Sequence, residues 1–197
     1  MNIVIIKYNA GNIRSVLFAL ERIGIEAQVT DDPEKIGAAD KVIFPGVGEA
    51  SSAMSYLQDR KLDQLIKHLE QPVLGVCLGM QLLCVHSEEN NTDCMGVFPE
   101  SVKKFLPGGN ETFKVPQMGW NNIYDLKSDL FRGIPENSYC YFVHGYYAGL
   151  GEATIARTDY ILPYSSALHH KNFFGVQFHP EKSASVGEQI LKNFIRL

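Results

Sequence analysis

The sequence predicts an α/β fold with a mixed, largely parallel central sheet flanked by helices. In the first 95 residues, short apolar runs alternate with amphipathic helical patterns across short connections, as in parallel sheets covered by helices. After residue 95, short apolar runs alternate with turns instead, which predicts an antiparallel or mixed extension of the same sheet. Because the sequence contains no linker, repeat or low-complexity segment, we expect a single domain over residues 1–197.

The first half contains four predicted strands, at residues 2–8, 25–30, 40–44 and 72–76. Residues 12–23 carry apolar side chains at helical spacing. Gly24 is expected to end this helix, because glycine readily adopts the left-handed conformation that closes helices. Two further helices are expected at residues 51–57 and 62–69.

The second half is predicted to hold short strands at residues 97–98, 102–106, 113–115, 122–124, 139–143 and 154–157, and around residue 168. Residues 107–110 (PGGN) give a strong turn signal. A last strand at residues 173–178 leads into His179, and a closing helix at 183–195 follows, with Ser183 as its expected N-cap.

Composition excludes several classes of function. The chain is 45% hydrophobic and 20% charged with a net charge of −4, as in ordinary globular proteins, and no basic run indicates nucleic-acid binding. No apolar stretch approaches the roughly 20 residues that cross a membrane, and the first residues read as a strand rather than a signal peptide. The four cysteines form no Cys-x-x-Cys pair, so we expect free thiols and a cytoplasmic location.

One motif carries the chemistry. The apolar run at residues 72–76 ends at Cys77, with Gly75 and Gly79 two residues to either side and a helical pattern at 78–85 directly after it. A strand, a tight turn and a helix are the elements of a nucleophile elbow, here with a thiol as the nucleophile. The glycines are expected because the turn is strained and passes close to its neighbours.

Groups that could assist this thiol are available. A helix N-terminus and a nearby histidine both increase the thiolate fraction of a cysteine. The backbone N–H groups of Leu78 and Gly79 have no helical partner, so we expect them to be free to stabilise an oxyanion. His179 can move a proton, and Glu181 lies two residues on, so that both side chains face the same side of an extended segment.

These residues alone do not choose between a protease, an amidase and a thioesterase. No spacing indicates a metal site. Four further histidines and the three other thiols are interpreted as surface or packing residues. They are His68, His86, His169, His170, Cys84, Cys94 and Cys140.

The elbow at residues 75–81 (GVCLGMQ), together with residues 177–183 (QFHPEKS), resembles the class I (triad) glutamine amidotransferases. Four further segments narrow the resemblance to the glutaminase subunits of imidazole glycerol phosphate synthase: residues 10–16 (AGNIRSV), 45–48 (PGVG), 116–121 (PQMGWN) and 141–144 (YFVH). The chain differs from that pattern at residues 7–9, which read KYN where relatives usually read DYG, and at Gly145, where a small hydroxyl residue is common.

The resemblance implies a glutaminase mechanism. Cys77 would attack the side-chain amide of glutamine, His179 would protonate the departing ammonia and then activate water, and Glu181 would orient His179. The oxyanion would be held by the N–H groups of Leu78 and Val47. Glutamine would be bound by Gly48, Gln81, Glu89, Gly145 and Tyr146, and no cofactor or metal is implied.

The resemblance also implies a partner. Ammonia would pass into a (β/α)8-barrel cyclase subunit, which would form imidazole glycerol phosphate and aminoimidazole carboxamide ribotide in histidine biosynthesis. Interface positions implied in this chain are Asn12, Met118, Trp120, Tyr141 and Lys182. We further hypothesise that the Val47 peptide is turned away until the partner binds, because Gly46 and Gly48 allow such a rotation at low cost.

Three other interpretations compete with this one. The first is a triad glutaminase of anthranilate, aminodeoxychorismate, guanylate or pyridoxal phosphate synthesis, against which residues 118–121 and 141–144 argue. The second is a cysteine hydrolase of the intracellular peptidase type, which would act on peptides. The third is a catalytically silent subunit that only stabilises the barrel, which an intact set of Cys77, His179 and Glu181 disfavours.

Overall fold

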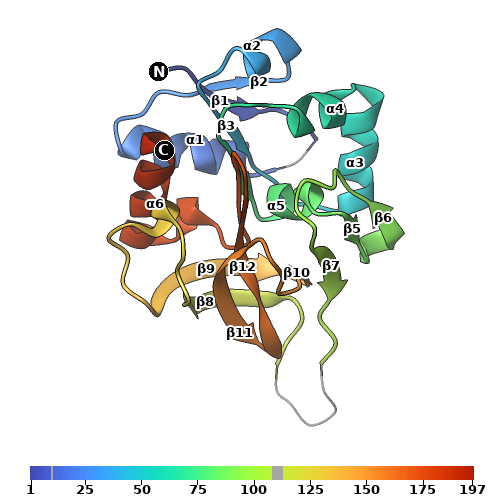
Figure 1. Ribbon diagram of the computed structural model, residues 1–197, viewed down its shortest axis with the longest axis vertical. Helices are drawn as coiled ribbons and strands as arrows, with labels where there is room; N and C mark the ends of the chain where they lie inside the picture. Colours follow the sequence, from blue (N-terminus) through green and yellow to red (C-terminus); the bar gives the residue numbers. More distant parts are fainter. Residues whose placement is uncertain (10, 108–112) are drawn as a thin grey trace.

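The computed structural model describes residues 1–9, 11–107 and 113–197 (Figure 1). Its strands are β1 (Ile3–Ile6), β2 (Gln28–Thr30), β3 (Lys41–Phe44), β4 (Val73–Val76), β5 (His86–Ser87), β6 (Thr92–Asp93), β7 (Ser101–Lys104), β8 (Gln117–Ile123), β9 (Ser138–His144), β10 (Tyr146–Ala148), β11 (Thr154–Tyr160), β12 (Leu162–His170) and β13 (Phe173–Val176). Its α-helices are α1 (Ile13–Arg22), α2 (Pro33–Gly37), α3 (Ala50–Asp59), α4 (Leu62–Lys67), α5 (Leu78–Leu83) and α6 (Ala184–Arg196), with 3₁₀ turns η1 (Glu89–Asn91), η2 (Asp129–Phe131) and η3 (Pro180–Lys182).

One mixed sheet runs through the described residues in the order β2-β1-β3-β4-β13-β12-β10-β7-β5-β6, with β11 paired to β12. The pairs from β2 to β13 are all parallel, and from β13 to β7 the strands pair antiparallel. The predicted class, a mixed and largely parallel sheet flanked by helices, is confirmed. The change after residue 95 corresponds to the antiparallel part, although β8 and β9 form a separate two-stranded sheet.

Helices cover both faces of the parallel part, because its strands are apolar on both sides. In β1, Ile3 and Ile5 face a core that contains residues of α1 and α6, whereas Val4 and Ile6 face a core that contains residues of α2, α3, α4 and α5. Figure 1 shows α1 and α6 side by side, away from α3 to α5. The sheet thus carries two hydrophobic cores, and its strand ends remain available for a site.

Several predicted boundaries were wrong. Residues 97–98 form a bend instead of a strand, because the N–H groups of Val97 and Phe98 both bond the Leu83 carbonyl at the end of α5. Residues 113–115 are also irregular, and the strand begins only at Gln117, after Pro116, which has no N–H to pair. The strand expected around residue 168 is the nine-residue β12.

Other elements were not predicted. Helix α2 follows Asp32, whose side chain accepts the Glu34 N–H, and Pro33 occupies its first turn, a start signal that the sequence carried. Strands β5, β6 and β10 have two or three residues each, too few for a periodic pattern. Gly24 ends α1 with a φ of 79°, as expected. The turn predicted at residues 107–110 lies largely outside the described residues.

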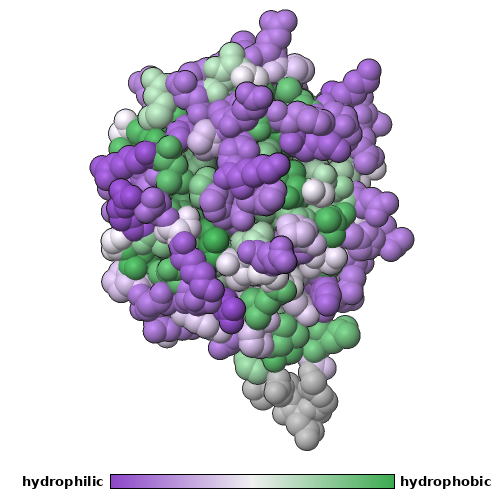
Figure 2. Space-filling model, in the orientation of Figure 1, coloured by the Kyte–Doolittle hydropathy of each residue, from purple (hydrophilic) through white to green (hydrophobic). Residues whose placement is uncertain are grey.

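The visible surface agrees with the composition. Figure 2 shows one face of the molecule, on which hydrophilic residues predominate and hydrophobic patches are interspersed from top to bottom. Across residues 1–9, 11–107 and 113–197, none of the helices has the length and apolar character needed to cross a membrane.

Candidate active site

Cys77 and His179 are brought together by sheet topology. Cys77 follows β4 and His179 comes three residues after β13, and these strands are parallel neighbours in a register that pairs Val76 with Val176. Since the carboxyl ends of parallel strands share one edge of the sheet, the segments after them meet there. Val47, after β3, lies at the same edge.

The predicted elbow at Cys77 has a strained backbone, and the glycines on either side of it are in close contact with neighbouring backbone. Cys77 has φ 53° and ψ −109°, a conformation that a residue with a side chain rarely adopts. A Cβ on Gly79 would lie 1.9 Å from the Phe44 carbonyl oxygen, and one on Gly75 would lie 2.9 Å from the backbone of Met80. The two glycines therefore let α5 begin directly against β3 and β4.

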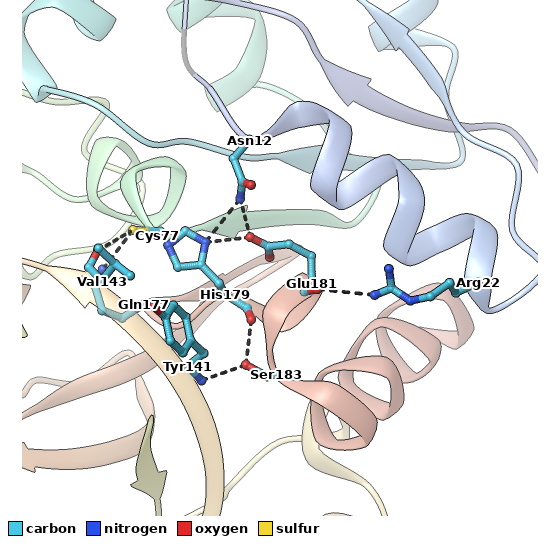
Figure 3. Close-up of polar contacts among 9 residues, drawn as sticks. All are labelled: Asn12, Arg22, Cys77, Tyr141, Val143, Gln177, His179, Glu181 and Ser183. Carbon is cyan, nitrogen blue, oxygen red and sulfur yellow. Dashed lines mark hydrogen bonds and ion pairs between the residues drawn. The ribbon is translucent and has the colours of Figure 1, made fainter. Parts of the chain in front are cut away.

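The imidazole of His179 lies between Cys77 and Glu181 (Figure 3). Its Nδ1 is 2.7 Å from Oε1 of Glu181, and both side chains are almost fully buried. Burial lowers the pKa of His179, but the negative charges of Cys77 and Glu181 outweigh it and raise the pKa to about 10. The negative charges around His179 therefore favour its imidazolium form beside the Cys77 sulfur.

Several hydrogen bonds hold the backbone of His179 and the carboxylate of Glu181 in place. The His179 N–H donates to the Tyr141 carbonyl at 2.8 Å, and the Ser183 hydroxyl donates to the His179 carbonyl at 2.7 Å. Ser183 Oγ also accepts the Tyr141 N–H, so it does not cap α6 as predicted. The Asn12 amide donates to Oε1 of Glu181, which places a residue expected at the interface against the carboxylate that pairs with His179.

The other thiols differ from Cys77 in their surroundings. Burial raises the pKa of Cys94 and of Cys140 to about 12, and raises that of Cys84 well above its ordinary value. None of the three lines the cavity at Cys77. Their interpretation as packing residues agrees with these positions.

The expected oxyanion donors, the N–H groups of Leu78 and Val47, are not both available to the cavity in this structure. The Leu78 N–H was expected to be free, but it donates to the Gly46 carbonyl at 3.2 Å. The reason is the close approach of the Pro45–Gly48 segment to the start of α5, where a Cβ on Gly46 would lie 2.8 Å from Cβ of Leu78. Because the Gly46 carbonyl and the Val47 N–H belong to one peptide and point in opposite directions, the Val47 N–H points away from Leu78.

Tyr8 fixes the neighbouring peptide, a contact that sequence reasoning missed. Its buried hydroxyl donates to the Pro45 carbonyl at 2.6 Å, and its ring packs on Phe44. Burial raises the pKa of this phenol above its ordinary value, so it remains a donor. The signal available in the sequence was its position at the end of the first strand, one strand away from residues 45–48.

A cavity of about 310 Å³ opens at Cys77. All residues predicted for catalysis, oxyanion binding and substrate binding line it, except Glu181, which lies behind His179. Unpredicted wall residues are Pro116, Val143 and His144. The Glu89 carboxylate accepts the Ala50 N–H at 2.8 Å, and burial raises the pKa of Glu89.

Two buried glutamines connect the cavity to the sulfur. The Gln81 amide donates to the Tyr146 carbonyl and to Oε1 of Gln177, both at 2.9 Å. Nε2 of Gln177 is 3.7 Å from the Cys77 sulfur. Gln177 was not predicted as a site residue, although its place next to Cys77 follows from the parallel register of β4 and β13.

The β8–β9 hairpin presents an exposed apolar face beside the site. Trp120 pairs with Tyr141 across the hairpin, and their rings are 5.9 Å apart. Met118 and Tyr139 lie on the same face by strand alternation, and Met118, Trp120 and Tyr139 are 67%, 52% and 60% exposed. We call these four side chains the hairpin face. The ammonium of Lys182 lies 5.9 Å from the Tyr141 ring and so continues the hairpin face toward the cavity.

In the part of the chain that the structure describes, no group of three or more His, Cys, Asp or Glu side chains is placed to hold a metal ion. The chemistry available here is that of a thiol, an imidazole and a carboxylate in a partly enclosed cavity.

Comparison with known proteins decides the family. The family model described as "Glutamine amidotransferase class-I" matches residues 4–197. The chain belongs to the class-I glutamine amidotransferase family. Among curated members, the "Imidazole glycerol phosphate synthase subunit HisH" of Bacteroides fragilis is 58% identical, and that of Bacteroides thetaiotaomicron is 54% identical, each over 100% of both chains. The protein of the same name from Idiomarina loihiensis is 45% identical over 100% of this chain and 98% of its own.

Solved structures agree on the amidotransferase fold. A structure titled as a glutamine amidotransferase matches with a TM-score of 0.75 at 18% identity, covering 100% of this chain and 98% of that one. The structure of PurLQS from Thermotoga maritima matches with a TM-score of 0.71 at 17% identity, covering 99% and 97%. The predicted resemblance to class I glutamine amidotransferases, and within them to imidazole glycerol phosphate synthase subunits, is confirmed.

Proposed function

We propose that this chain hydrolyses the side-chain amide of glutamine and delivers the ammonia to a cyclase that makes imidazole glycerol phosphate and aminoimidazole carboxamide ribotide in histidine biosynthesis. The Cys77 thiolate attacks the amide carbon, and the carbonyl electrons move to oxygen. When the tetrahedral intermediate collapses, His179 gives its proton to the departing nitrogen, and ammonia leaves a thioester on Cys77.

In the second half-reaction, neutral His179 removes a proton from water. The hydroxide attacks the thioester carbon, the C–S bond breaks, and glutamate leaves while His179 again carries the proton that pairs with the thiolate. Glu181 accepts the hydrogen bond from Nδ1 throughout, which holds the imidazole in orientation and stabilises its charge.

The observation that carries this proposal is the coincidence of a strained Cys77 and the His179–Glu181 pair at one cavity. Full-length similarity to imidazole glycerol phosphate synthase subunits supports the choice of glutamine over a peptide substrate. The cavity volume suits a ligand of amino-acid size. We assign Gly48, Gln81, Glu89, Gly145 and Tyr146 to glutamine binding because all five line this cavity.

Replacing Cys77 with alanine tests the assignment. In the complex with a cyclase subunit, C77A should abolish glutamine-dependent synthesis, while added ammonia should still support the cyclase at the wild-type rate. The matched control is C94A, which removes a thiol outside the cavity and should leave glutamine-dependent synthesis unchanged. Persistent glutamine hydrolysis by C77A would contradict the proposal, as would failure of ammonia rescue in an intact complex.

The hairpin face, with Lys182, is our proposed docking surface for a (β/α)8-barrel cyclase subunit. Exposed apolar side chains with aromatic character are typical of the centres of protein interfaces. The position supports ammonia transfer, because Val143 and Lys182 line the cavity that contains Cys77 and also adjoin this face. A covered path would keep ammonia unprotonated, whereas in water at neutral pH it becomes ammonium, which is a poor nucleophile. Asn12 is also part of the proposed interface, although its amide contacts Glu181 in this structure.

We also propose that the Gly46–Val47 peptide controls activity. The Leu78 N–H is occupied by the Gly46 carbonyl, so an oxyanion has no open donor there until this peptide rotates. Rotation would free the Leu78 N–H and turn the Val47 N–H toward the substrate at once. Glutaminase turnover of the isolated chain tests this idea: we expect it to be low and to rise on addition of the cyclase subunit, and full turnover without a partner would refute it.

Two further features belong to the proposal. Residues 1–197 act as a single amidotransferase domain, which is supported by one sheet that continues from the parallel to the antiparallel part. A cytoplasmic location is supported by the four free cysteines, since thiols persist in reducing compartments.

A further inference from the structure

Gln177 holds a position next to the sulfur that its backbone fixes. It follows β13 directly, it is fully buried, and its N–H donates to the Ser166 carbonyl at 2.9 Å. The Cys77 N–H in turn donates to the Val176 carbonyl at 2.8 Å, so the two residues lie side by side. The side-chain amide of Gln177 therefore has little choice of partners other than the Cys77 sulfur and Gln81.

The orientation of the Gln177 amide follows from the groups around it. The Tyr146 carbonyl can only accept a hydrogen bond, so Gln81 must direct its NH₂ group toward it. The same NH₂ group also faces Gln177, which must therefore present its oxygen to Gln81. This leaves the NH₂ group of Gln177 directed at the Cys77 sulfur (Figure 3). The Tyr146 carbonyl thus determines the direction of the hydrogen bonds from Gln81 to Gln177 and from Gln177 to the Cys77 sulfur.

The direction of these hydrogen bonds favours one charge state of the sulfur. The Val143 carbonyl, 3.8 Å from the sulfur, can accept a hydrogen bond from a thiol but offers nothing to a thiolate. The Gln177 amide does the opposite, because a hydrogen bond donated to a charged group stabilises the charged form. In a buried site such a bond is stronger than in water.

We propose that Gln177 is a further catalytic residue, which stabilises the Cys77 thiolate through its side-chain amide, and that Gln81 orients it from the Tyr146 carbonyl. The inference rests on the proposed function, since it concerns the nucleophile of that reaction. It also gives Gln81 a role in addition to substrate binding. Because Tyr146 belongs to the cavity wall, the same contacts connect the substrate site to the sulfur.

The test measures the thiolate itself. Alkylation of the isolated chain by iodoacetamide is followed against pH, with the modified peptide identified by mass spectrometry, since only the thiolate reacts. Other charged or titratable groups around the sulfur are the same in each variant, so they shift all curves equally; these groups are Tyr8, Glu89, His144, Tyr164, His179, Glu181 and Lys182.

In Q177M, which keeps the length of the side chain but has no amide, the inflection of the curve should move upward by about one pH unit, so alkylation should fall about tenfold at pH values below the wild-type inflection. Q81M removes no group in contact with the sulfur, but it removes the hydrogen bond that orients the Gln177 amide. We therefore expect the inflection to move upward by less than in Q177M. Q71M is the matched control, because it removes a glutamine that bonds the Ile36 carbonyl far from the cavity, and its curve should coincide with wild type.

An unchanged inflection in folded Q177M would overturn the proposal, and so would a downward shift. If Q177M does not fold, Q81M decides alone, and a curve identical to that of Q71M would overturn the proposal. The readout needs no glutamine, so it is independent of the proposed activity. Loss of glutaminase activity in the C77A experiment tests that activity separately, and either result can fail without the other.

Discussion

Gly79→Ala tests whether close packing builds the elbow. Gly79 is the second residue of α5, and its Cα faces the end of β3. An added Cβ would lie 1.9 Å from the Phe44 carbonyl oxygen and 2.9 Å from its carbonyl carbon. Both groups belong to backbone, so no side-chain rotation can relieve the contact.

The size of the effect follows from this distance. Real Cβ atoms essentially never approach other heavy atoms within 3.0 Å, so α5 and β3 must separate by at least 1.1 Å. Phe44 is paired with Gly75 of β4, the strand that carries Cys77, so the displacement also opens the central sheet. Overpacking of buried sites costs about 1–3 kcal/mol and sometimes more, and we expect the upper end, about 3 kcal/mol of unfolding free energy. In a chain of this length that corresponds to a loss of roughly 6–12 °C in melting temperature.

Urea and thermal unfolding of the purified chain measure the effect. The matched control is Gly37→Ala at the end of α2, where an added Cβ meets no atom within 4 Å and φ is not in the left-handed region. That substitution should be neutral or stabilising by about 0.4–1 kcal/mol, because alanine restricts the unfolded chain. If Gly79→Ala unfolds within about 0.5 kcal/mol of wild type, close contact between α5 and Phe44 does not hold the elbow.

Three further predictions follow from single contacts. Tyr8→Phe leaves the buried Pro45 carbonyl without its 2.6 Å partner and should cost about 1–3 kcal/mol in urea unfolding, and an unchanged midpoint would contradict that bond. Burial lowers the pKa of His144 to about 4, whereas a histidine in the unfolded chain titrates near 6.5. As the pH falls, the unfolded chain therefore binds the proton first, and the unfolding free energy should drop by about 3 kcal/mol between pH 6.5 and 4. His144→Gln should flatten this part of the plot of unfolding free energy against pH. Trp120→Ala should leave the isolated chain nearly as stable as wild type, because the Trp120 side chain is half exposed. In calorimetric titration, the same substitution should weaken binding to the cyclase subunit about thirtyfold. An affinity equal to that of wild type would remove Trp120 from the proposed interface.

The central parallel strands β1, β3, β4 and β13 were predictable because each is a separate apolar run with a predicted helix after it. The antiparallel part was harder for physical reasons. Strand β10 has three residues, and β12 includes buried Ser165 and Ser166, which interrupt the apolar pattern. Hydrogen bonds from Thr154 to Ser165, and from Ser165 to the Gly149 carbonyl, satisfy one hydroxyl by contacts that only the folded sheet creates.

The candidate catalytic residues could be found in the sequence because each is a side chain with its own chemistry at a recognisable turn. What the sequence could not indicate is where main-chain groups point. The bond from the Leu78 N–H to the Gly46 carbonyl depends on the rotation of one peptide, which glycine leaves open on both sides of Val47. Likewise, Gln177 acquires its contact with the sulfur only through strand register, and its amide carries no motif of its own.

These two kinds of contact differ in how easily they can change. The His179–Glu181 pair is fixed by hydrogen bonds from separate elements. Tyr141 on β9 and Ser183 before α6 hold the backbone of His179, and Asn12 before α1 holds the carboxylate of Glu181. Moving that pair would break several buried hydrogen bonds at once. The Gly46–Val47 peptide is joined to α5 by the Leu78 N–H and is followed by Gly48 at φ 124°. In the proposed complex, a partner that supplies only a few kcal/mol could therefore turn this peptide but could not rebuild the His179–Glu181 pair. The proposed control of the reaction thus falls on the oxyanion donors.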